Sequence, residues 1–159
     1  MQSHQNICYL CFKMEELDNL TLADEADLIA TLPVYQQTIV KNLINHNGND
    51  YLGAAEGWIS ASLTNVSKFG GENRNQTYRK SLLDELRKYL CGDAFYENDR
   101  QNLQKIGKKT YPVIIGALTM AISPVVGVAA PLLAPAIILI LLSIGKMSVN
   151  AWCNLNTQV

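Results

Sequence analysis

The chain lacks the residue combinations from which most active sites are built. Its 159 residues include only two histidines, His4 and His46, and neither lies in a motif that pairs it with a nucleophilic serine or cysteine. The glycine pair at 70–71 is not followed by the lysine of a phosphate-binding loop. The clustered carboxylates fall on helix faces that we expect to be solvated, which is a poor setting for acid–base chemistry. We therefore expect neither enzymatic activity nor a cofactor.

An excess of basic residues is also missing. Thirteen Lys and Arg stand against 14 Asp and Glu, a formal net charge of −1, so we expect no nucleic-acid partner. The N-terminus lacks the basic, apolar and small-residue pattern of a secretory signal, which predicts a cytoplasmic front part, residues 1–109. In a reducing compartment the cysteines should be free thiols. They are Cys8, Cys11, Cys91 and Cys153.

A metal site would need a fourth ligand from far along the chain. His4, Cys8 and Cys11 have metal-like spacing, but a structural zinc ion normally needs four ligands, and the remaining candidates are His46, Cys91 and Cys153. Cys8 and Cys11 alternate with apolar residues, as small buried thiols do. We expect no metal.

Charge is absent from residues 110–145, the apolar segment. Of the 27 charged residues, 26 precede Thr110 and only Lys146 follows it. A segment of this kind either enters a membrane or forms the buried centre of a soluble helical protein. We favour membrane insertion and keep the buried core as the alternative.

The front part predicts an all-α fold of about five short helices. Amphipathic spacing, proline and glycine breaks and possible caps place these helices at about 21–33, 34–44, 51–66, 76–91 and 94–106. Thr21 is the expected cap of the first helix, Pro33 its end, and Gly92 the cap after the fourth. The helix at 51–66 is rich in glycine, alanine and serine, which favours close packing against its neighbours.

The C-terminal part, residues 110–159, predicts an apolar helical hairpin interrupted by proline and glycine. A single helix of 36 residues would be about 54 Å long, well beyond the hydrocarbon thickness of about 30 Å. We expect one arm from Pro112 to about Ser123 and a second from Pro135, with a Pro-rich turn between them. A re-entrant hairpin, two short spans and one kinked, tilted crossing all remain open. The residues expected to insert are Pro112, Ile114, Ile115, Leu118, Pro124, Pro131, Leu133, Pro135, Ile138 and Leu141.

Residues that favour a membrane interface flank the apolar segment. Basic residues favour the cytoplasmic side, and tyrosine and tryptophan favour the interface itself. This predicts a cytoplasmic front part associated with the inner membrane. The interface residues are Lys105, Lys108, Lys109, Tyr111, Lys146 and Trp152.

Together these patterns predict a non-enzymatic, membrane-associated helical protein. Its hairpin would contact membrane lipids, self-associate and permeabilise the bilayer, under the control of the front helices and of a regulatory protein partner. The architecture resembles small bacterial membrane-disrupting effectors, such as those that act against phage, which implies a defence or toxin-like role. The alternatives are a soluble interaction or assembly module that buries the hairpin, and a passive membrane anchor.

Overall fold

The described part of the chain is entirely helical, as the sequence predicts. A computed structural model describes residues 20, 23–64, 72–107, 110–145 and 149–157, and these contain no strand. The elements are α2 Glu25–Ile29, α3 Val34–His46, α4 Tyr51–Thr64, α5 Glu72–Leu90, η1 Ala94–Tyr96, α6 Glu97–Gln104, α7 Tyr111–Val126, α8 Ala130–Ile144 and α9 Val149–Thr157.

Several boundaries in the front part differ from expectation. Helix α2 begins at Glu25, after an extended Asp24, and the expected cap Thr21 lies outside the described residues. It ends at Ile29, before the expected Pro33, which instead precedes α3. The helix expected at 94–106 is divided into η1 and α6.

Helix α5 begins at Glu72, four residues before the expected start. Gly92, by contrast, has a φ of +87° and terminates α5 as predicted. The next amide, that of Asp93, donates to the Lys88 carbonyl at 2.9 Å and so satisfies one of the last carbonyls of the helix.

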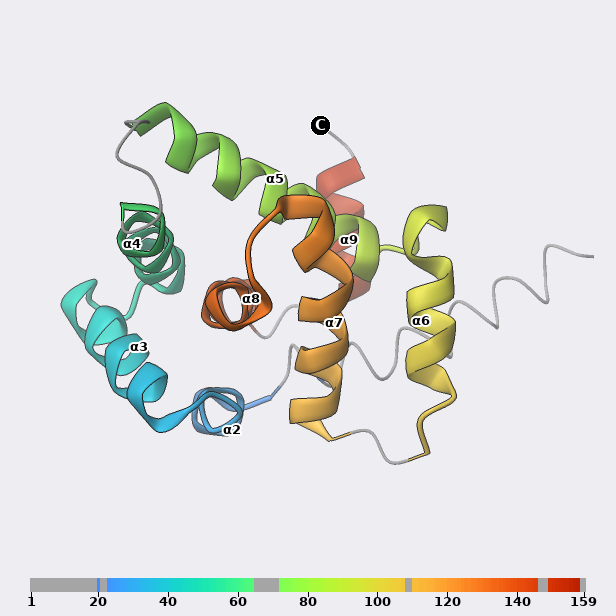
Figure 1. The fold of residues 1–159 in the computed structure, drawn as a ribbon, viewed down its shortest axis with the longest axis horizontal. Helices are drawn as coiled ribbons and strands as arrows, with labels where there is room; N and C mark the ends of the chain where they lie inside the picture. Colours follow the sequence, from blue (N-terminus) through green and yellow to red (C-terminus); the bar gives the residue numbers. More distant parts are fainter. Residues whose placement is uncertain (1–19, 21–22, 65–71, 108–109, 146–148, 158–159) are drawn as a thin grey trace, which may run out of the picture.

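Helix α8 is the central element of the fold (Figure 1). It is seen almost end-on, with α2, α4 and α7 around it, and each of these three packs against it. Every residue from Pro135 to Leu142 is buried. A helix that is apolar on all sides is stable in water only when other helices enclose it, so the front helices and α7 share one core with α8.

Helix α4 packs closely on both sides, as its small residues predict. Ala54 and Ala55 are buried in the core that α4 forms with α8. On the side facing α3, a Cβ added to Gly57 would lie 3.1 Å from Cδ2 of Leu43, so the two helices are in tight contact there. Small side chains therefore allow α4 to stand between α3 and the central helix.

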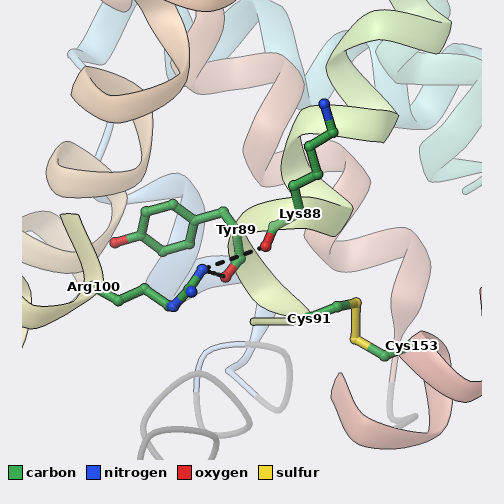
Figure 2. The surroundings of a disulfide bond; sticks show 5 residues. All are labelled: Lys88, Tyr89, Cys91, Arg100 and Cys153. Carbon is green, nitrogen blue, oxygen red and sulfur yellow. Dashed lines mark hydrogen bonds between the residues drawn. A yellow bond between two sulfur atoms is a disulfide. The ribbon is translucent and has the colours of Figure 1, made fainter. Parts of the chain in front are cut away.

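The C-terminal end of α5 is fixed by two later elements (Figure 2). Arg100 of α6 is buried, and its guanidinium donates to the Tyr89 carbonyl at 3.0 Å. It also donates to the Asp93 carbonyl at 2.6 Å. Cys91 forms a disulfide with Cys153 of α9 across a Cα–Cα distance of 5.6 Å. The expectation of free thiols is therefore wrong for this pair, while Cys8 and Cys11 lie outside the described residues.

Candidate functional site

The candidate site is the hairpin formed by α7 and α8. The two helices are bent by 112° at a short break. Helix α7 continues through Pro124 to Val126, beyond the expected end at Ser123, and stops at Gly127, whose φ is +78°. The second arm begins at Ala130 with Pro131 in its first turn, so the prediction that it starts at Pro135 was wrong.

The second arm ends where the uncharged segment ends. Helix α8 stops at Gly145, which has a φ of +68° that side chains other than glycine rarely adopt, and α9 begins at Val149. The apolar hairpin and α9 are therefore separate helical elements, and α9 packs against α5.

Each arm of the hairpin is short. Among the described residues no single helix is long and apolar enough to cross a membrane, whereas α7 and α8 together meet that requirement of length and composition. The core helix of a soluble protein would meet it as well. The hairpin is thus compatible with both interpretations of the apolar segment.

Pro135 lies inside α8, and a side chain from α3 compensates for it. Proline has no amide hydrogen, so the carbonyl of Pro131, four residues earlier, lacks its helical donor. Nε2 of Gln36, a residue only 2% exposed, donates to this oxygen at 2.9 Å. Beside it, Nε1 of Trp58 in α4 donates to the Leu132 carbonyl at 2.8 Å. Two front helices therefore hold the first turn of α8 through its backbone.

The hydroxyl groups of the hairpin bond within the hairpin itself. Thr119 donates to the Ile115 carbonyl, Ser123 to that of Val128 at 2.5 Å, and Ser143 to that of Ile140 at 2.6 Å. A polar group that is already paired costs less to transfer into an apolar medium than an unpaired one. These three side chains therefore keep their partners if the hairpin leaves the bundle, whereas the bonds from Gln36 and Trp58 would be lost.

The structure divides the predicted membrane-inserting residues into two groups. Three prolines are exposed, namely Pro112, Pro124 and Pro131. The other seven are buried in the bundle: Ile114, Ile115, Leu118, Leu133, Pro135, Ile138 and Leu141. Their insertion stays a prediction, and it would require α8 to leave the surrounding helices.

One face of α7 is apolar and faces solvent. Met120 is 70% exposed and Pro124, one turn later, is also exposed, while the opposite face of the helix contributes Leu118 and Ile122 to the core. Gly116 lies one turn before Met120 on the exposed face, and a Cβ added there would have no atom within 4 Å. The hairpin therefore presents apolar surface before any rearrangement.

The predicted interface residues are only partly described. Lys105 is exposed at the end of α6, and Tyr111 and Trp152 are half-buried. Trp152 lines a cavity of about 370 Å³ between α4, α5, α8 and α9, whose rim carries the Asp84–Arg87 ion pair. Lys108, Lys109 and Lys146 lie outside the described residues.

Two tyrosine–carboxylate pairs have structural roles. The Tyr96 hydroxyl donates to the Glu85 carboxylate at 2.5 Å, and burial, followed by this bond, raises the pKa of Tyr96. The Tyr51 hydroxyl donates to Glu25 at 2.6 Å, and that bond is the main reason why its pKa rises to about 12. Both pairs join separate helices.

No metal centre is formed within the described ranges, where three or more His, Cys, Asp or Glu side chains nowhere cluster suitably. The three residues with metal-like spacing, His4, Cys8 and Cys11, lie outside those ranges. Sequence reasoning missed Gln36, Trp58 and the Cys91–Cys153 pair. Pro135 was the one available signal, because a proline inside a helix leaves a carbonyl that needs a donor.

A double-mutant cycle tests whether Gln36 compensates for Pro135. Gln36→Leu should lower the free energy of unfolding by about 1 kcal/mol, because the Pro131 carbonyl loses its donor. In a Pro135→Ala background the restored amide supplies that donor, so the same substitution should cost markedly less. Urea unfolding of the four proteins measures the coupling. Equal losses in both backgrounds would contradict this role of Gln36.

Comparison with known proteins gives no functional assignment, so the proposal below is based on the hairpin. No protein family model, curated protein or solved structure matches the chain.

Proposed function

We propose that this protein stores an apolar hairpin inside a helical bundle and inserts it into a lipid bilayer, where it self-associates and makes the membrane permeable. The observation that carries the proposal is α8. It is uncharged, buried on all sides, and joined to α7 within a segment of 36 residues that has no charge. Such a helix is equally compatible with hydrocarbon once the front helices that surround it, α2 and α4, move away.

The helices around α8 are proposed to control when the hairpin is released. Helices α2, α4 and α7 enclose α8, and Gln36 and Trp58 hold its first turn. Opening of the bundle would cost these contacts, which keeps the hairpin enclosed until a membrane or a regulatory protein partner offsets the loss. The chain is proposed to act without enzymatic chemistry, as a toxin-like or defence effector.

The site of action is proposed to be the inner membrane, with the front part on the cytoplasmic side. The Cys91–Cys153 disulfide favours an oxidising compartment instead. Cell fractionation with alkylation of free thiols before lysis distinguishes the two locations.

The second candidate is a soluble interaction or assembly module. It is favoured by the same burial of α8, because the described helices already form a continuous core without a membrane. This candidate predicts that the full-length protein stays in solution as a single species when vesicles are present. It also predicts that added charge on α7 changes nothing beyond solubility.

A matched pair of lysine substitutions tests the first candidate. Met120→Lys adds a charge to the exposed face of α7, and Val34→Lys adds the same charge at a residue of α3 that is 77% exposed. Both should leave stability within about 0.5 kcal/mol. Only Met120→Lys puts the charge into the bilayer, at a cost of about 3 kcal/mol, so it should lower membrane partition about a hundredfold.

The measurement is flotation with phosphatidylcholine–phosphatidylglycerol vesicles, then carbonate extraction and release of a trapped dye. Wild-type protein and Val34→Lys should float, resist extraction and release dye, while Met120→Lys should remain at the bottom of the gradient. Wild-type protein that never floats excludes insertion and supports the soluble module. Flotation without dye release supports a passive anchor. Chemical cross-linking in the vesicles measures self-association.

A further inference from the structure

The disulfide connects the chain on one side of the hairpin to the chain on the other. Cys91 follows the last residue of α5, Cys153 lies in α9, and 62 positions separate them. The closed loop contains η1, α6 and the whole of α7 and α8. Figure 2 shows the bond at the junction of α5 and α9. The disulfide therefore links the segment that leads into the hairpin, through η1 and α6, to the segment that follows it.

The segment between the hairpin and the disulfide is short on the C-terminal side. Ile144 ends α8, and Cys153 follows nine positions later. Nine fully extended residues reach about 30 Å, which only just equals the hydrocarbon thickness. A chain that crossed the bilayer once through α7 and α8 would have to send this segment back to rejoin Cys91. The segment includes Lys146 and would place unpaired backbone groups in hydrocarbon.

The bend between the arms is consistent with the same restriction. The chain direction already changes by 112° between α7 and α8, and Gly127 with its positive φ terminates the first arm. The bonding of Ser123 to the Val128 carbonyl satisfies part of the turn. A folded-back pair can thus enter a bilayer with its turn leading, without straightening the break into one continuous helix.

We infer that the Cys91–Cys153 disulfide fixes the topology of the inserted state. With the bond intact, the hairpin enters with both of its ends on the same face of the membrane. A single crossing, with α9 on the far face, is open only to a chain that lacks the bond. This inference rests on the proposed function and selects among the membrane topologies that the sequence left open.

The test uses the full chain with a peptide tag after Val159, disulfide-bonded as judged on a non-reducing gel. The protein is added to preformed phosphatidylcholine–phosphatidylglycerol vesicles, floated, and treated with an external protease. The tag should be removed from more than nine-tenths of the floated protein. Protection of the tag while the disulfide is intact overturns the inference. The same digestion in detergent shows that the tag is cleavable.

Cys153→Ser shows whether the bond itself imposes the restriction. The floated variant should have a protected tag fraction at least fivefold above that of the bonded protein. Equal and low protection in both would overturn the role assigned to the disulfide. Absence of flotation in both proteins removes the proposed function, and this inference with it. Flotation with a protected tag in the bonded protein removes the inference alone.

Discussion

Leu139→Ala is expected to lower the free energy of unfolding by about 3 kcal/mol, because it leaves a cavity in the middle of the core. Leu139 is fully buried in α8, with buried neighbours on both sides along the chain. The surrounding helices should relax only partly around the missing side chain, so that most of the cavity remains. Urea or thermal unfolding followed by circular dichroism measures the change.

Met120→Ala is the control in the same hairpin. Met120 is 70% exposed, so its truncation should change stability by no more than about 0.5 kcal/mol. A large difference between the two variants, measured in the absence of lipid, means that α8 is enclosed in water. Similar, small effects would mean that α8 does not occupy the centre of the bundle, and the stored-hairpin proposal would lose its basis.

Cys153→Ser is expected to lower the free energy of unfolding by about 4 kcal/mol, from the loop-closure entropy of a bridge that spans 62 positions. Without the bridge the unfolded chain gains conformations, while the folded helices keep their contacts. The comparison is urea unfolding of the oxidised wild type against the variant.

Cys91→Ser should give the same loss, because either substitution removes the same bond, and the double variant should lose no more than either single one. Dithiothreitol should reduce the stability of the wild type alone. A wild-type protein that is indifferent to dithiothreitol would show that the bridge contributes little to stability.

Local patterns predicted the fold class and the division of the apolar segment. The all-α architecture follows from helical spacing between Pro33, the glycine turns and the proline-rich break, since each of these acts over a few residues. The close packing of α4 was likewise evident from its small side chains. The membrane role is still a prediction, because an enclosed helix and an inserted helix have the same composition.

Long-range pairing could not be predicted in the same way. Gln36 lies 95 positions from Pro131, and no local rule connects a glutamine in one helix to a carbonyl in another. This bond supplies the donor that Pro135 lacks, and without knowledge of it the sequence placed the start of the second arm at Pro135. The disulfide was missed because the absence of a secretory pattern led us to expect a reducing compartment and free thiols. Spacing along the chain also does not show which cysteines meet.

The central position of α8 also has a consequence for how the protein is made. Residues 130–144 leave the ribosome after α2 to α7, yet α2, α4 and α7 all pack against them. The apolar faces of the earlier helices therefore stay exposed until nearly the whole described chain has been synthesised. Because the core forms late and from distant segments, the nascent chain is exposed to aggregation, and we expect chaperones to bind it during synthesis.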